Sequence, residues 1–423
     1  MNAIAMDISR LIGRSHFSTP TGIDRFELQY ANWAQKRSSH FLEIGRNRPI
    51  EIARTRATEL ISALAHRWSA AGLNPLQTEE LQRIFAAIDG EAPWPRVKSA
   101  SISPAGRTFH SWSRRAGKAL RTILPANQFA AGASLLHVSH TNLHRPAAFN
   151  WMERQKRNGV FYVHDLIPLT HPEFVRPNEP MRHLQRMETI LRHAGLVLCN
   201  SQATARSFRA FAEERGKPTP PIEVLAPGVE ASFRRPNAAV HATRRPYFLV
   251  VGTIEPRKNH ILLLQTWRAM VDAHGDDVPR LVIAGKRGWE NAQVFATLDR
   301  CPQLRNAVIE APNLGDTALA ELMAGAAALL SPTFVEGYGM PVAEARAMGT
   351  TIIASDIASH REVAGDNALY LDPLDGRGWR EAIEAHARYE RRQRPHIVQH
   401  WDGHFGTLDG LLNEQRDRLP LGG

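Results

Sequence analysis

Short apolar runs alternate with stretches of helical spacing along most of this chain. In the first half, such runs predict strands at Ala3 to Ile8, Phe41 to Ile44, Leu135 to Val138, Val160 to Val163, Leu196 to Cys199 and Glu223 to Leu225. Between residues 52 and 89, apolar residues recur at helical spacing and predict helices. Continuous apolar strands that alternate with helices are typical of a parallel sheet covered on both faces.

The alternation stops near Phe233 to Pro246, where no periodicity is visible, and then begins again. We interpret this stretch as a linker between two domains, residues 1–240 and residues 241–398. A second set of strands is predicted at Tyr247 to Val251, Arg280 to Ala284, Ala307 to Glu310, Ala326 to Leu330, Thr351 to Ala354 and Ala368 to Leu371. The sequence therefore predicts an α/β fold with two doubly wound, Rossmann-like domains facing a cleft, where ligands bind beyond the carboxyl ends of the strands.

The overall composition narrows the class of protein only a little. A length of 423 residues with 43% hydrophobic and 22% charged residues is ordinary for a globular chain of two or three domains. Two cysteines, Cys199 and Cys301, imply no disulfide framework, so a reducing compartment is expected. The net charge of +10 favours anionic partners. No zinc-ligand spacing or nucleic-acid-binding motif is visible, so we expect no nucleic-acid partner.

The N-terminus lacks the layout of a signal peptide, and no apolar run is long enough to span a bilayer. We expect a cytoplasmic protein, or one that is peripheral on the inner face of the cytoplasmic membrane. Residues 92–152 contain no acidic residue, and they include Arg114, Arg115, Lys118 and Arg121. This span is either an arm that contacts anionic lipid or a lipid-linked acceptor, or a solvated basic loop, which needs no partner.

The most informative stretch runs from Leu329 to Gly349. An apolar run ends at Ser331, a loop with two glycines follows, and Pro341 and Gly349 suit the first turn and the end of a helix. Backbone N–H groups of such a loop and helix start form a site for phosphate. Glu336 precedes the glycines and Glu344 is expected in the first helical turn, so their carboxylates can accept hydrogen bonds from sugar or ribose hydroxyls. The arrangement suits a nucleotide-sugar.

These residues resemble the donor motif of the family 4 glycosyltransferases, which are retaining enzymes of the GT-B fold. The commonest form of that motif has Phe where Tyr338 stands here. The resemblance implies that Glu336 holds the hexose, that Glu344 holds the ribose, and that the last helix, within residues 399–423, packs back on the first domain. It also implies donor contacts from the loop itself, namely Gly337, Tyr338, Gly339 and Met340. An ordinary strand, loop and helix with surface glutamates remains the alternative.

A second glycine loop lies near the N-terminus, after the first predicted strand. Residues 18–25 resemble the loop that lies beneath the donor diphosphate in the same family, but only Gly22 matches, and Asp24 stands where a second small residue is common. Gly22 is therefore a candidate backbone contact for the donor. A simple capped turn explains the same residues equally well, and the roles of Asp24 and Arg25 stay open.

A cationic pair follows the strand at Tyr247 to Val251. Arg257 and Lys258 can neutralise a diphosphate leaving group, and the family places a Lys at the position of Lys258. The family often has an Arg where Thr253 stands, so one charge contact differs here. The sequence has no Asp-x-Asp at a strand end, and we therefore expect no metal and no other cofactor. Solvated charge at a turn is the alternative.

His164 closes a hydrophobic strand and would face the cleft, where the resemblance implies contact with the donor sugar or the acceptor. A single histidine at a strand end is usually structural. Glu362 is interpreted as a structural or capping residue. With the segment from Gly252 to Asn259, the stretch after His164 looks most like bacterial mannosyltransferases of surface-polysaccharide assembly.

The sequence thus predicts retaining, metal-independent transfer of a hexose, first of all mannose from GDP-mannose, to a glycan or lipid-linked acceptor. The catalytic residues would be His164, Lys258 and Glu336. Two alternatives stay open: a nucleotide-sugar epimerase, which needs no acceptor, and a silent binding protein, which turns nothing over.

Overall fold

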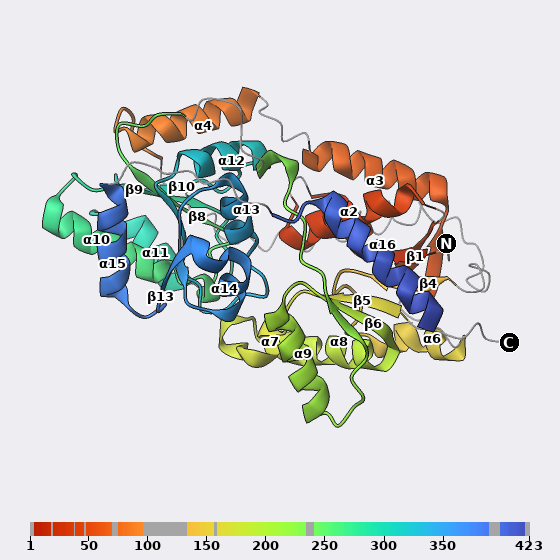
Figure 1. The fold of residues 1–423 in the computed structure, drawn as a ribbon. Coiled ribbons are helices and arrows are strands. Elements are labelled where there is room, and N and C mark those ends of the chain that lie inside the picture. The colour runs from red at the N-terminus through yellow and green to blue at the C-terminus, as the bar shows by residue number, and fades with distance from the viewer. Residues whose placement is uncertain are drawn as a thin grey trace.

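In the computed structural model, the chain forms two sheets whose strands are mostly parallel, each with helices on both faces (Figure 1). The described residues are 4–17, 20–37, 39–45, 48–69, 75–95, 133–155, 159–233, 241–388 and 398–418. The basic residues of 96–132, on which the lipid-contact interpretation rests, lie outside these ranges. No described helix has the length and apolar character that crossing a bilayer would require.

The first sheet has the strand order β3-β2-β1-β4-β5-β6-β7. Its strands are β1 (Ile4–Asp7), β2 (Ser39–Ile44), β3 (Pro49–Ile52), β4 (Ser134–His137), β5 (Gly159–Val163), β6 (Ala194–Cys199) and β7 (Ile222–Val224). All neighbours run parallel except β3, which pairs antiparallel with β2. The sequence did not predict β3, because it is short and begins with Pro49, a residue confined to edge strands and strand ends.

Two helical layers cover the first sheet. One face packs against α1 (Ser9–Arg14), α2 (Gly22–Gln35) and α3 (Arg54–Ser69), and the other against α6 (Asn150–Arg154), α8 (Glu179–His193) and α9 (Gln202–Glu214). A one-turn helix, α7 (Ile167–Thr170), follows β5. The sequence predicted no element at α1, because a helix of six residues is too short for its spacing to be visible.

The second sheet has the strand order β10-β9-β8-β11-β12-β13, and all its neighbours run parallel. Its strands are β8 (Tyr247–Val251), β9 (Arg280–Ala284), β10 (Val308–Glu310), β11 (Ala328–Ser331), β12 (Ile352–Ser355) and β13 (Ala368–Leu371). One face packs against α12 (Asp316–Gly325), α13 (Met340–Met348) and α14 (Ala358–Ala364), and the other against α10 (His260–His274), α11 (Ala292–Arg300) and α15 (Gly376–Ala387). The predicted doubly wound architecture is confirmed.

Two helices cross between the halves of the chain. Helix α4 (Pro75–Ile88) comes early in the sequence, yet its buried Leu81, Ile84 and Ile88 belong to the core of the second sheet. Helix α16 (Trp401–Arg418) comes last and packs Leu408 into the core of the first sheet. Figure 1 shows α4 beside α12 and β10, and α16 beside α2. The boundary at residue 240 therefore divides the two sheets but not the helices that cover them.

Candidate functional site

The glycine motif lies at the carboxyl end of β11, where the second domain faces the first. Gly339 precedes α13 with φ 100°, and Gly349 ends it with φ 71°, so both use the left-handed backbone that glycine allows. Glu344 is the fifth residue of α13, which begins at Met340. It therefore lies in the second helical turn, and its placement in the first turn was wrong.

Glu336 belongs to a network of four charged side chains, together with Lys258, Arg257 and Glu255. Its Oε1 pairs with the ammonium of Lys258, and its Oε2 lies 2.6 Å from Nη1 of Arg257. Arg257 also pairs with Glu255 through its Nε, at 2.6 Å. Burial opposes the ionised form of Glu336, but Arg257 and Lys258 outweigh it and hold the pKa of this carboxyl at about 2. Glu336 is therefore a permanent hydrogen-bond acceptor with two cations beside it.

The loop after β8 presents these cations because it is tied to the loop after β11. Asn259 takes a left-handed conformation, with φ 54°, and its side-chain amide donates to the carbonyls of Pro332 and Pro373 at 3.1 and 2.9 Å. The backbone N–H of Phe334 donates to the Arg257 carbonyl at 2.9 Å. Two loops that are far apart in the sequence are thereby held together by hydrogen bonds.

Gly337 brings the two domains into contact. A Cβ at this position would clash with the backbone oxygen of His164 and lie 3.0 Å from the Cβ of Asp165. Burial disfavours the charged form of Arg257. The nearby carboxylates of Glu336, Glu255 and Asp165 outweigh this effect and raise the pKa of the guanidinium. The structure thus places His164, a predicted site residue, in contact with the predicted donor loop at Gly337.

His164 is a neutral side chain that uses one ring nitrogen within the protein. Its Nε2 lies 2.8 Å from the carbonyl of Val138, which fixes that nitrogen as the donor, and the ring packs edge-on against Phe26 at 4.9 Å. Burial lowers the pKa of His164 to about 4. The Nδ1 atom therefore remains a hydrogen-bond acceptor at neutral pH.

Glu344 is buried and lacks a hydrogen-bond partner among the described residues; 7% of the residue is exposed. Burial raises the pKa of its carboxyl to about 8, and the nearby charges come from Arg25, which lowers the pKa, and from Asp316 and Glu230, which raise it. Arg25 of the first domain pairs with Asp316 of the second. This carboxyl is available for a hydroxyl-bearing ligand.

The N-terminal loop has the structure of a capped turn. Gly22 is the first residue of α2, and Thr21 and Asp24 form a reciprocal capping box with 3.3 and 2.7 Å contacts. Asp24 is fully buried and pairs with Arg10 and Arg14. The capped turn that the sequence left open is therefore present, while donor contact by Gly22 stays a prediction.

Several residues near the site were not predicted to act there. Asp165 faces Arg257, Arg25 bridges the domains, and Ser201 and Thr204 contact the Gly337 carbonyl. The position of Ser201 at the end of β6, before a helix, was a visible signal, but its partner 136 residues away was not. Within the described ranges, no group of three or more His, Cys, Asp or Glu side chains is arranged to hold a metal ion.

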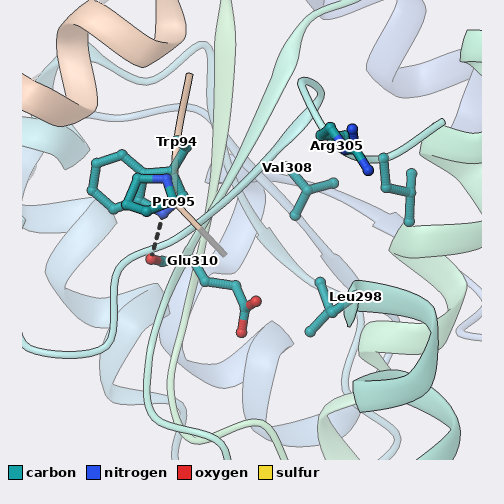
Figure 2. A pocket seen from close by; sticks show the side chains of 7 residues that line it. Trp94, Pro95, Leu298, Arg305, Val308 and Glu310 are labelled. Carbon is teal, nitrogen blue, oxygen red and sulfur yellow. Dashed lines mark hydrogen bonds between the residues drawn. The ribbon is translucent and has the colours of Figure 1, made fainter. Parts of the chain in front are cut away.

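A small cavity lies away from this cluster, at the edge strand β10 (Figure 2). Its volume is about 20 Å³, and Trp94 covers it by donating to the Glu310 carbonyl at 3.0 Å. A space of that size holds about one water molecule. It cannot hold a nucleotide-sugar, so the candidate site remains the interdomain cluster around Glu336.

Comparison with known proteins supports this assignment. Residues 245–388, almost the whole second domain, match the family described as glycosyl transferases group 1. The resemblance to the family 4 glycosyltransferases is confirmed. The match covers the domain that carries Arg257, Lys258, Glu336 and Glu344.

Two of the curated relatives are mannosyltransferases of Escherichia coli. The serotype-specific mannosyltransferase WbdA of Escherichia coli is 30% identical over 261 residues, which cover 56% of this chain and 30% of WbdA. The O-antigen chain mannosyltransferase B of Escherichia coli is 34% identical over 246 residues, which cover 56% of this chain and 62% of that protein. The chain thus spans less than two thirds of the length of these relatives.

Solved structures confirm the GT-B fold. Sucrose-phosphate synthase from Thermosynechococcus elongatus matches with a TM-score of 0.60 at 14% identity, covering 99% of this chain and 100% of that one. Anabaena HepE in complex with UDP matches with a TM-score of 0.58 at 13% identity, with the same coverage. The chain is therefore a two-domain α/β protein of the GT-B fold.

Proposed function

We propose that this protein is a retaining glycosyltransferase that moves a hexose from a nucleotide-diphosphate sugar to a hydroxyl of a glycan or lipid-linked acceptor. The observation that carries the proposal is Glu336, held ionised between Arg257 and Lys258 in the loop before α13. This donor requires two features of a site. One is a carboxylate that accepts hydrogen bonds from sugar hydroxyls, and the other is a set of cations that face the diphosphate.

In this proposal, the chemistry is the departure of the nucleotide diphosphate. Negative charge grows on its phosphate oxygens as the sugar–phosphate bond breaks, and preorganised cations and N–H groups stabilise that charge where it forms. Lys258, Arg257 and the N-terminus of α13 supply positive potential on one side of the cleft. These groups do so without a metal, and we propose a metal-independent reaction.

The remaining site residues would orient the donor and the acceptor. Glu336 would accept hydroxyls of the hexose, and the buried Glu344 would accept those of the ribose. The neutral Nδ1 of His164 would accept a hydroxyl of the sugar or the acceptor. The acceptor would attack from the face that the leaving group departs, which retains the configuration.

Two relatives support mannose and a glycan as the substrates of first choice. One is named a serotype-specific mannosyltransferase and the other an O-antigen chain mannosyltransferase. We therefore propose GDP-mannose as the donor. An acceptor of this kind would be presented at the inner face of the cytoplasmic membrane, and we propose that the protein works there as a peripheral enzyme.

A donor panel tests the proposal. The protein is incubated with GDP-mannose, UDP-glucose and UDP-N-acetylglucosamine, with and without a lipid-linked glycan and with and without EDTA, while nucleotide release and sugar identity are followed. We expect acceptor-dependent release from GDP-mannose that survives EDTA. Product formed without an acceptor would favour an epimerase, and binding without turnover would favour a silent binding protein. Activity lost in EDTA and restored by magnesium or manganese would overturn the metal-independent mechanism.

A further inference from the structure

The N-terminus of α9, in the first domain, contacts the donor loop of the second. Ser201 caps α9 by accepting the Thr204 N–H at 3.0 Å, and its hydroxyl donates to the Gly337 carbonyl at 2.6 Å. The Thr204 hydroxyl donates to the same carbonyl at 3.2 Å. Both residues are buried, at 0% and 3% exposure. One carbonyl of the donor motif is therefore held by two hydroxyls of the opposite domain.

A second contact fixes the same helix end. Glu362 of α14 accepts the backbone N–H groups of Gln202 and Ala203 at 2.7 and 3.3 Å, so a carboxylate of the second domain caps a helix of the first. Helix α14 is itself joined to α13, because Arg346 donates to the Val363 carbonyl at 2.7 Å. The end of α9 is thus clamped between the donor loop and the helix that supports it.

The direction of the Gly337 carbonyl has a consequence for the next peptide N–H. In a planar trans peptide the C=O and the N–H point in opposite directions. The Gly337 oxygen faces α9, so the N–H of Tyr338 points away from α9. Neither Tyr338 nor Gly339 donates its backbone N–H to any partner in the described part of the chain. These N–H groups are left for a ligand at the start of α13.

We propose that the N-terminus of α9 positions the donor loop: Ser201 and Thr204, supported by Glu362, turn the Gly337 peptide so that the N–H group of Tyr338 faces the donor diphosphate. The nature of the donor rests on the proposed function. The cations and carboxylates assigned to the hexose, the ribose and the diphosphate lie in the second domain, so a nucleotide binds there first. The loop is turned for catalysis only when the first domain, which would carry the acceptor, has closed.

Two substitutions remove the hydroxyl contacts, and each has a matched control. Thr204→Val keeps the shape of the side chain, and Ser207→Ala is its control, since the Ser207 hydroxyl bonds within α9 to the Ala203 carbonyl. Ser201→Ala removes both a helix cap and the contact. Asp375→Ala removes a cap of α15 alone, where the Asp375 carboxylate accepts the Gly378 N–H at 2.9 Å.

For the Ser201→Ala/Thr204→Val double variant we expect kcat to fall roughly tenfold to thirtyfold, as the loss of two hydrogen bonds implies. The dissociation constants of GDP and UDP should stay within about twofold of the wild-type values, because only the closed state uses these contacts. The controls should keep full kcat. A kcat equal to that of the controls, or nucleotide affinity falling in parallel with kcat, would overturn the positioning role.

Substitution of Glu362 provides an independent test that does not depend on measuring turnover. In Glu362→Ala the backbone N–H groups of α9 lose their cap, so small-angle X-ray scattering with GDP or UDP should show a larger radius of gyration than the wild-type protein. Glu381→Gln, at an exposed pair with Arg377, is the control. Glu362→Gln, which keeps one acceptor oxygen, should recover part of the compaction. An unchanged radius in Glu362→Ala would refute the clamp, whereas wild-type protein that binds no nucleotide would refute only the proposed function.

Discussion

The α-carbon of Gly337 and the backbone oxygen of His164 belong to different domains, and no side chain fits between them. Gly337→Ala would place a methyl group against that oxygen and push the domains apart. A displacement of about 1 Å at a reaction centre costs about a hundredfold in rate. We expect kcat to fall by that factor while GDP and UDP affinities stay within a few-fold, measured by steady-state kinetics and calorimetry.

Gly406→Ala is the control for this substitution, because Gly406 lies in α16 and a methyl group added there would meet no described atom within 4 Å. It should leave kcat unchanged. A Gly337→Ala enzyme with normal turnover would show that the interdomain contact at His164 is not needed during the reaction.

Lys258 tests the stabilisation of the leaving group. In Lys258→Ala, Arg257 still pairs with Glu336, so the carboxylate keeps one cation but the diphosphate loses one. Losing one preorganised cation at developing charge typically costs about 3 kcal/mol, or roughly a hundredfold in rate. We expect weaker donor binding and slower turnover, and only partial recovery in Lys258→Arg, since a guanidinium differs in shape from an ammonium. The exposed Lys217→Ala is the control, and a fully active Lys258→Ala enzyme would exclude this role.

Glu344 makes stability depend on pH in a defined direction. Its pKa of about 8 in the folded protein lies above the ordinary value of 4.5, so the folded state holds this proton more tightly than the unfolded state. The stabilisation is complete below pH 4.5 and is lost as the pH rises to 8. Glu344→Gln should therefore raise the melting temperature relative to wild type at pH 8 and much less at pH 5. An equal shift at both values would show that Glu344 does not titrate in this window, and Glu381→Gln should shift neither.

The same carboxyl predicts proton release on nucleotide binding. Ribose hydroxyls that donate to Glu344 favour its ionised form and lower its pKa. Calorimetry of GDP or UDP binding at pH 7 in buffers of different ionisation enthalpy should therefore report released protons. Glu344→Gln should abolish the release and weaken binding. Binding without any proton change in the wild-type protein would place the ribose elsewhere.

His164 should act as a neutral acceptor and not as an acid. With its pKa at about 4, no inflection in kcat from this residue is expected between pH 5 and 8. His164→Ala should lower kcat by about fivefold, the usual value of one lost hydrogen bond, and leave nucleotide binding nearly intact. Parallel loss of nucleotide binding would instead mean that the substitution disturbs the fold around Val138 and Phe26.

Much of the second domain could be predicted because buried parallel strands are nearly continuous apolar runs. The strands Tyr247–Val251, Arg280–Ala284 and Ala368–Leu371 match the predicted bounds. The helix after the glycine loop was visible from Pro341 and Gly349, which mark its two ends.

What the sequence could not provide were partners far apart in the chain. The spacing of α4 shows that one face is apolar but not which sheet that face covers. The contact between Ser201 and Gly337 joins two loops that carry no shared pattern. Glu362 was interpreted as a capping residue, and it does cap a helix, but one in the other domain. Interdomain contacts of this kind arise from the closed arrangement and leave no local signal.

Helix α4 packs on the second domain although it comes early in the sequence. This position limits how the second domain can be moved into another protein. A fusion joined at residue 241 would transplant a domain whose core normally includes Leu81, Ile84 and Ile88 of α4. The recipient enzyme would have to supply its own helix or leave an apolar patch in water. A chimera intended to change the donor sugar should therefore import residues 75–95 together with residues 241–388, as two separate inserts that fold as a single unit.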